Sequence, residues 1–386
     1  MPDFAFAAWR LPGREEISVS VCKNVVEPAP GSALPDSSGF FAAGFADNSA
    51  RYWLPAEAGL QLNDAGQVLN RTYTADSPAY NSEAESFLDL LQASFHDALQ
   101  TIPAGIFQLS QLPDAAEAEL AGMHYRALVE KGVESIKAGR LRKVVPARKR
   151  SISFSGAFPL MRYFRLACRL YPNAFVYALH IPGKATWAGA TPETLLSGKD
   201  GKLQTMALAA TRRAKSDYFY KEKLPPAPDW TGKELEEQEL VSEYIRDSFK
   251  HAGLPHFTET GPAEVQAGSL RHLRSRFETT GATDAQKTNL LNLLHPTSAV
   301  GGSPRQAALE FLEKNEDLDR GLYAGYIGPA DVGNFSMFVN LRCIQVKGNE
   351  ILLYAGAGLT GDSVPEQEYL ETKAKMQTSV AVLKLL

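Results

Sequence analysis

The segment 364–375, VPEQEYLETKAK, places two carboxylates and one ammonium group at a spacing that brings them together. On a helix, Glu368, Glu371 and Lys375 share one face because they lie three and seven residues apart. Continuing at about 100° per residue, the same face becomes apolar near the C-terminus. Three charged groups therefore point inward, which is costly unless they are paired or bind a ligand. The apolar continuation consists of Val382, Leu383 and Leu386, with Ser379 between them.

A second acidic helix is predicted for residues 233–249, KELEEQELVSEYIRDSF. Glu234 and Glu237 fall on its apolar side, whereas Glu236 and Glu239 fall outside it. One such helix is explained equally well by long side chains that reach back to solvent. Four converging carboxylates would repel one another, and a hard cation such as Mg²⁺ removes that conflict. Neutralisation by lysine or arginine is the alternative.

Two further features are suited to binding an anion. Gly356 and Gly358 lie in YAGAGLTG, where a strand is expected to end just before the last helix. Glycines there permit close approach to the backbone, and their N–H groups can hold an anion. Arg342 lies in NLRCI within an expected alternating strand, and arginine suits bidentate carboxylate binding. Each feature alone is common, and Arg342 is equally explained as a surface residue.

Candidate proton donors and acceptors stand in separate segments. Lys143 falls on the same strand face as Val145 and Ala147, so we expect it to point inward, where a lysine can act as a general base. Glu193 lies in a turn in WAGATPETLL, where it either starts a helix or acts as a general acid with a raised pKa. His295 precedes a proline, which favours an extended or turn conformation. Without a second histidine nearby, it indicates no metal cluster.

The bulk composition is that of an ordinary globular protein, with 44% hydrophobic and 22% charged residues in 386. The formal net charge of −4 gives no support for a nucleic-acid or membrane-surface partner, and we read the basic run 142–150 as solvated. Three widely spaced cysteines form no disulfide or zinc pattern, which suits a reducing cytoplasm. We see no secretory signal and no stretch long enough to span a membrane, so we expect a cytoplasmic protein.

The order of expected elements indicates an α+β fold. Strand-like runs, among them 202–213, 321–328 and 335–346, occur in clusters with hairpin spacing, and helices such as the one expected near 284–294 fall between the clusters without strict β-α-β alternation. We therefore predict a large layered α/β sandwich of mostly antiparallel sheets with helices outside. We expect one domain, residues 1–386, with a variable part at 1–115 and a core at 116–386. The last helix is expected to begin with a capping box formed by Ser363 and Glu366.

Taken together, these motifs resemble the chorismate-utilising enzymes, the family that includes anthranilate synthase component I, and most closely its isochorismate synthases. The resemblance covers about residues 118–386 and is most specific in the last ninety. It is carried, in order, by KVVPAR, AGATPETLL, MALAATRR, KELEEQELV, LRHL, LLHPTSAVGGSP, DRGLYAGYIG, FVNLRCI and YAGAGLTGDSVPEQEYLETKAK. It implies a layered α/β catalytic domain that holds Mg²⁺ and chorismate in a central cleft. It also favours a monomer.

The resemblance also implies roles for individual residues. Glu237 and Glu371 match direct Mg²⁺ ligands, and Glu234 and Glu368 match carboxylates that act through water. Arg342, Tyr323 and Lys375 match residues that contact the substrate carboxylates, with backbone donors from Gly356 and Gly358. Ala210, Thr211 and His295 complete the expected substrate-binding set, although the family usually has glycine where Ala210 stands.

Two positions separate the branches of the family. Isochorismate and salicylate synthases carry a lysine at the position of Lys143, which activates water, whereas ammonia-using relatives usually have glutamine. Relatives with a nucleophilic lysine carry it where this chain has Ala209. Both positions favour water as the nucleophile, with Glu193 protonating the departing hydroxyl. Isochorismate synthase is the resulting hypothesis, and salicylate synthase or a non-catalytic chorismate-binding paralogue are the alternatives. The product would feed menaquinone or siderophore synthesis, depending on neighbouring enzymes.

Overall fold

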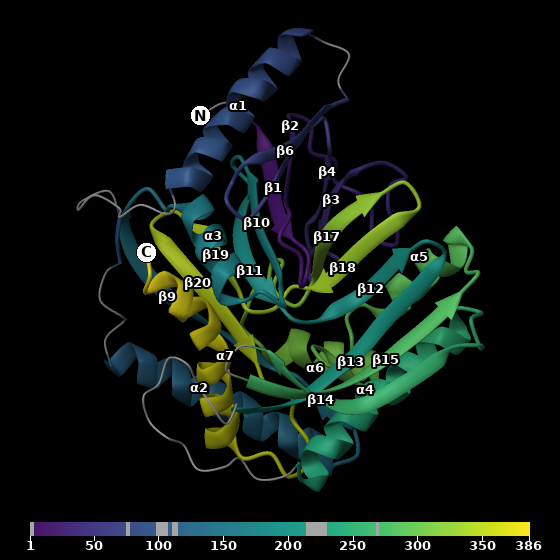
Figure 1. Ribbon diagram of the computed structural model, residues 1–386. Coiled ribbons are helices and arrows are strands. Elements are labelled where there is room, and N and C mark those ends of the chain that lie inside the picture. Colours follow the sequence, from purple (N-terminus) through teal and green to yellow (C-terminus); the bar gives the residue numbers. More distant parts are fainter. Residues whose placement is uncertain (1–3, 75–77, 98–106, 110–114, 214–229, 268–269) are drawn as a thin grey trace.

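The computed structural model describes residues 4–74, 78–97, 107–109, 115–213, 230–267 and 270–386. Two antiparallel sheets dominate it (Figure 1). The larger sheet has the order β6 (Val68–Tyr73), β5 (Ala58–Leu62), β2 (Ile17–Cys22), β1 (Ala5–Arg10), β10 (Phe175–Ile181), β11 (Ala185–Thr191), β19 (Cys343–Lys347), β20 (Glu350–Gly356), β9 (Ala147–Gly156) and β7 (Phe107–Leu109). The smaller sheet has the order β14 (Thr258–Ala267), β15 (Leu270–Thr280), β13 (Lys202–Arg213), β12 (Thr194–Lys199), β18 (Asn334–Val339), β17 (Tyr326–Asp331), β3 (Gly39–Ala43) and β4 (Arg51–Pro55). A short pair, β8 (Lys143–Val144) and β16 (Gly302–Ser303), lies apart from both.

The helices cover the outer faces of these sheets. They are α1 (Pro78–Asp97), α2 (Ala115–Lys137), α3 (Leu160–Leu170), α4 (Gly232–His251), α5 (Asp284–Leu294), α6 (Arg305–Asn315) and α7 (Pro365–Leu383). Helices α1, α3 and α7 belong to the hydrophobic cluster on the outer face of the larger sheet. Helix α4 packs on β13 and β15 of the smaller sheet. The prediction of an antiparallel layered sandwich with helices outside is confirmed.

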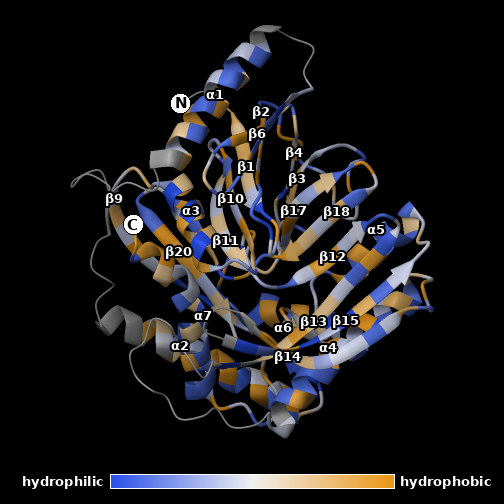
Figure 2. Cartoon of the chain, in the orientation of Figure 1, coloured by the Kyte–Doolittle hydropathy of each residue, from blue (hydrophilic) through white to orange (hydrophobic). Residues whose placement is uncertain are grey.

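The core lies between the two sheets, and the alternation of side chains along the strands explains why. In β10, Phe175 and Tyr177 face the smaller sheet, whereas Val176 and Ala178 face the outer helices. Phe175 stacks on Phe338 of β18 with ring centroids 4.1 Å apart, so the sheets meet through aromatic side chains. Hydrophobic and hydrophilic segments alternate along the helices in Figure 2, as expected for helices with one buried face.

Three local predictions were wrong. The expected strand 321–328 begins only at Tyr326, because the preceding residues form a turn in which Ala324 has a φ of 59°. The expected continuous strand 335–346 is interrupted between β18 and β19, where the chain passes from one sheet to the other. Helix α7 has no capping box, because its first helical residue is Pro365 and the Ser363 hydroxyl instead accepts the Thr360 N–H.

Strands from the first seventy-four residues share both sheets with strands from the rest of the chain. The proposed boundary at residue 115 stays a prediction. Among the described residues, none of the helices combines the length and apolar character needed to cross a membrane.

Candidate active site

The candidate site forms where the chain crosses between the two sheets. Pro192 and Glu193 connect β11 of the larger sheet to β12 of the smaller one. Arg342 lies in the return crossing from β18 to β19 and has a φ of 51°, a conformation that non-glycine residues seldom adopt. The two crossings are joined by backbone hydrogen bonds, from Val339 to Glu193 at 3.0 Å and from Ala190 to Arg342 at 3.3 Å. The fold itself thus places an acid and a guanidinium side by side.

Two adjoining cavities open at these crossings. The inner cavity has a volume of about 50 Å³, and the outer cavity about 390 Å³. Of these, only the outer one reaches the size usual for small-molecule sites. Four residues line both, so the cavities share a wall: Pro192, Leu208, His272 and Arg342. The inner cavity is also lined by Glu193, Ala209, Ala210, Glu237, Ala299, Leu341, Gly358 and Lys375.

Glu193 is a buried acid in the wall of the inner cavity, with only 3% of its surface exposed. Burial raises the pKa of its carboxyl group to about 7, although Arg342, Lys143 and Lys375 oppose the rise. A carboxyl group with such a pKa is protonated in a large fraction of molecules near neutrality. Such a group is suited to donate a proton to a leaving group, and the role of Glu193 as a general acid stays a prediction.

Lys143 is completely buried, as its place on the strand predicted. Its ammonium group lies 3.1 Å from the Glu237 carboxylate, which lines the inner cavity. Two glycines permit this arrangement. Gly302 pairs with Val144 at a φ of 134°, and a Cβ there would lie 2.3 Å from the Lys143 carbonyl oxygen. A Cβ on Gly358 would lie 2.5 Å from Glu237 Oε1, so any side chain would displace the carboxylate.

Lys375 connects the last helix to the glycine-rich strand end. Its ammonium group lies 2.7 Å from Glu371 and donates to the Gly356 carbonyl at 3.0 Å. Lys375 and Gly358 both line the inner cavity. Among the hydrogen bonds of the described residues, none engages the Gly358 N–H, which fits its expected role as a donor. A Cβ on Gly356 would lie 3.3 Å from the Tyr323 hydroxyl, so that phenol sits beside the same loop.

The outer carboxylates are held differently from the inner ones. Glu234 accepts hydrogen bonds from Arg212 at 2.6 and 2.9 Å and from the Thr231 N–H at 2.8 Å. Burial alone would raise the pKa of Glu234, but these hydrogen bonds lower it on balance. Glu368 is 1% exposed, confirming that this face of α7 points inward. Burial, followed by the charges of Glu368 and Glu371, raises the pKa of Tyr125 on α2.

The carboxylates have the oxygen chemistry that Mg²⁺ prefers. Within the described parts of the chain, however, no three histidine, cysteine, aspartate or glutamate residues are close enough together to hold a metal ion. Glu237 and Glu371 each contact a lysine instead. Both side chains offer the oxygen ligands that Mg²⁺ prefers, and the magnesium site stays a prediction.

The remaining predicted residues fall in three different settings. Ala210 lines the inner cavity at a bulge in β13, with a φ of 54°. Thr211 pairs with His272 through the strand register, but its side chain lies outside the described residues. His295 lies away from both cavities: it caps the end of α5, and its Nε2 lies 3.0 Å from the Gly44 carbonyl oxygen. Burial lowers the pKa of His295 to about 3, so it is neutral.

Sequence reasoning missed two residues that shape the site. His272 on β15 lines both cavities, and its Nδ1 lies 3.1 Å from the Ala210 carbonyl oxygen. Burial, followed by the charges of Arg342 and Lys375, lowers its pKa to about 3. Gln238 on α4 is 2% exposed and accepts the Ala209 N–H at 3.0 Å, which anchors the bulge from behind. Of these two residues, only His272 could have been found from the sequence, because it is a polar residue at an inward strand position.

This fold and this cleft define a layered α/β protein with a buried acid, a buried lysine and a cavity lined by Arg342 and Lys375. The chain belongs to the chorismate binding enzyme family, whose model matches residues 64–384. Matched regions are 33% identical to a salicylate biosynthesis isochorismate synthase of Pseudomonas aeruginosa, over 65% of this chain and 53% of that protein. They are 30% identical to the isochorismate synthase MenF of Escherichia coli, over 72% of this chain and 66% of that protein.

Solved structures show the same fold. The menaquinone-specific isochorismate synthase MenF of Escherichia coli matches with a TM-score of 0.74 at 21% identity, over 98% of this chain and 88% of that one. Anthranilate synthase component I of Streptococcus pneumoniae matches with a TM-score of 0.65 at 19% identity, over 98% of this chain and 92% of that one. At these identities the likeness concerns the fold alone.

Proposed function

We propose that this protein is an isochorismate synthase that converts chorismate to isochorismate. The observation that carries the proposal is a cavity lined by a buried acid, Glu193, together with Arg342 and Lys375. Glu237 in the wall of the same cavity contacts the buried Lys143 at 3.1 Å. Two relatives are isochorismate synthases by name, which supports the same reaction. A protein that only binds chorismate has no need of a buried acid whose pKa is raised to about 7.

In the proposed reaction, water adds to C2 of the chorismate ring. Its proton passes to Lys143 Nζ, and the electron pairs of the two ring double bonds shift as the C4–oxygen bond breaks. Glu193 protonates the departing hydroxyl group, which leaves as water. One water molecule is consumed and one is released, so substrate and product are isomers and the protein acts as an isomerase. General acid and general base each contribute about 10²–10⁴-fold to the rate.

Substrate orientation is assigned to the cationic groups. Arg342 and Lys375 bind the two carboxylates of chorismate, with help from the Gly358 N–H and the Tyr323 hydroxyl. We assign Glu237 and Glu371 as the residues that would hold Mg²⁺, with Glu368 and Glu234 behind them. The ion would supply positive charge to the ring carboxylate. The support is the oxygen chemistry of these side chains and their inward position on two helices.

The cytoplasm and a monomeric state stay predictions. The three cysteines are buried and unpaired, which supports a reducing compartment.

The test is to incubate purified protein with chorismate, in Mg²⁺ or in EDTA, and to separate the products by chromatography. Isochorismate formed only with Mg²⁺ is the expected result. Salicylate together with pyruvate would move the protein to the branch that also eliminates pyruvate. Binding of chorismate without any product would make it a non-catalytic paralogue and overturn the proposal.

A further inference from the structure

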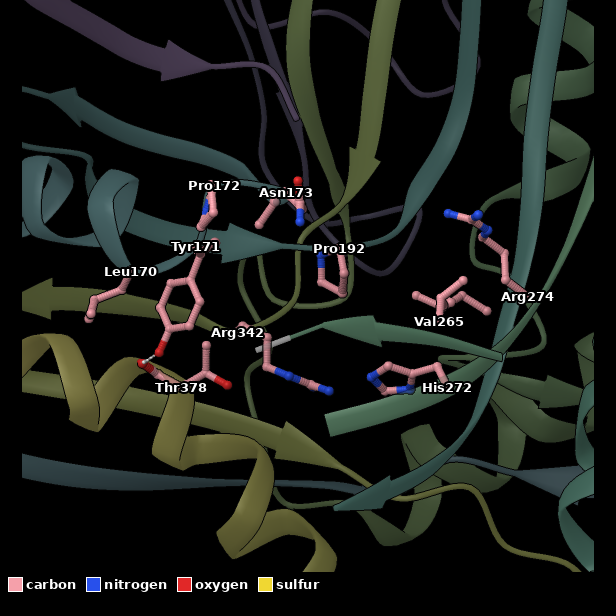
Figure 3. Close-up of a pocket in the computed structure, with 13 residues that line it drawn as sticks. Leu170, Tyr171, Pro172, Asn173, Pro192, Val265, His272, Arg274, Arg342 and Thr378 are labelled. Atoms are coloured by element: carbon pink, nitrogen blue, oxygen red, sulfur yellow. Dashed lines mark hydrogen bonds between the residues drawn. The ribbon is translucent and has the colours of Figure 1, made fainter. Parts of the chain in front are cut away.

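The outer cavity presents positive charge from two parts of the chain, strand β15 and the crossing between β18 and β19. Arg342 lies where it joins the inner cavity, and Arg274 of β15 lines its wall. Figure 3 shows the Arg342 side chain extending towards His272, with Arg274 on the far side of Val265. Among the described residues that line this cavity, none is an aspartate or glutamate. His272 is neutral near pH 7 because its pKa is lowered to about 3, so the charge comes from the two arginines.

Among the described residues, Arg274 has no carboxylate partner, and Arg342 forms no ion pair within 4.0 Å although the charges of Glu193 and Glu371 act on it. Arg212 pairs with Glu234 at 2.6 Å, and Arg271 pairs with Glu264 at 2.7 Å. For Arg274 and Arg342, the described part of the chain provides no ion pair within 4.0 Å. A half-buried guanidinium that faces a cavity without a partner is suited to bind an anion from solution.

The register of β15 explains why Arg274 faces the cavity. His272 and Arg274 are two residues apart on a strand, so their side chains lie on the same face. The intervening Leu273 is buried on the opposite face, in the core. Arg276 continues the row of His272 and Arg274, but it is exposed and does not line either cavity. The strand therefore offers a matched pair of arginines, one in the cavity wall and one outside it.

We propose that the substrate enters the site through the outer cavity. There Arg274 binds one carboxylate of the incoming dianionic substrate before the substrate moves into the inner cavity, where Arg342 and Lys375 bind it. The proposal rests on the function proposed above. Its chemistry is electrostatic attraction in a partly enclosed pocket, where a positive wall raises the local concentration of an anion. Arg274 thus sets how fast the substrate arrives and not how the reaction proceeds.

The test is a stopped-flow measurement of chorismate binding to the full chain at several ionic strengths, with protein fluorescence as the recorded signal. At low salt, Arg274→Gln should lower the association rate constant about three- to tenfold. The turnover number kcat should stay within about twofold, because capture precedes the bound state. Near 1 M salt the deficit should vanish, because the screening length falls to about 3 Å. Arg274→Lys should keep most of the rate.

Arg276→Gln is the matched control, since it removes the same charge outside the cavity, and it should change the association rate by less than about twofold. An unchanged association rate in Arg274→Gln would overturn the proposal. So would an equal deficit in Arg276→Gln, or a deficit that persists at high salt. Binding by the natural protein without turnover would defeat the proposed function while leaving this test intact. Absence of chorismate binding would defeat both.

Discussion

Replacing Glu193 by glutamine should remove a loss in the free energy of unfolding that the natural protein shows as the pH rises. Burial raises the pKa of this carboxyl group from 4.5 to about 7, against the opposing charges of Arg342, Lys143 and Lys375. Between these values the unfolded chain releases the proton while the folded chain keeps it. The folded state thus binds more protons, so the free energy of unfolding falls as the pH rises through this window.

The magnitude follows from the size of the shift. Each pKa unit corresponds to about 1.4 kcal/mol, so a rise from 4.5 to about 7 costs the natural protein about 3 kcal/mol above neutrality. Below about pH 4.5 the cost is absent, because both states are protonated. Glutamine has nearly the same shape and never ionises. The stability of Glu193→Gln relative to the natural protein should therefore increase by about 2.5 kcal/mol between about pH 5 and pH 8.

Urea unfolding of both proteins at several pH values measures this difference directly. Any constant cost of the amide group cancels, because only the change with pH is compared. Glu236→Gln on the exposed side of α4 serves as the control for removing one charge. A stability difference that stays flat from about pH 5 to pH 8 would refute the reasoning that burial controls Glu193. Since the acid must be protonated to act, kcat should also fall as the pH rises through about 7.

Three further predictions concern other parts of the site. Lys143→Met should bind chorismate but lose about 10²–10⁴-fold in turnover, measured by product chromatography; unchanged turnover would exclude Lys143 as the base. Glu371→Gln should weaken Mg²⁺ binding at least about tenfold in calorimetric titration, whereas the exposed Glu366→Gln should not; equal affinities would exclude Glu371 as a ligand. Ala210→Gly should leave the free energy of unfolding unchanged or raise it by up to about 1 kcal/mol, because Ala210 has a φ of 54°. Ala209→Gly, at the neighbouring position of the same strand, should lower the free energy of unfolding by about 1 kcal/mol. Equal losses of stability in the two variants would contradict a strained backbone at Ala210.

Features that depend on local spacing were predicted well from the sequence. The strand 202–213 and the helix 284–294 have the boundaries that their patterns indicated. The inward positions of Glu237 and Glu368 follow from helical periodicity, and the buried Lys143 follows from strand alternation. Each of these depends on residues only a few positions apart, which a single sequence displays directly.

Features that depend on distant parts of the chain were not predicted. Arg342 was assigned to a continuous strand, because alternation of side chains does not reveal where a chain leaves one sheet for another. His272 and Gln238 meet the bulge at Ala210 from a different strand and a helix. The pairing of Glu234 with Arg212 likewise joins a helix to a strand. The φ of 54° at Ala210, a conformation that favours glycine, is also visible only in the folded backbone.

The central claim is that this cleft adds water to C2 of chorismate while the C4 hydroxyl departs. The most direct measurement is to run the reaction in water enriched in heavy oxygen and analyse the product by chromatography with mass detection. Because water adds at C2, the isochorismate formed should carry one oxygen atom from the solvent. Isochorismate without solvent oxygen, or no isochorismate at all, would contradict it.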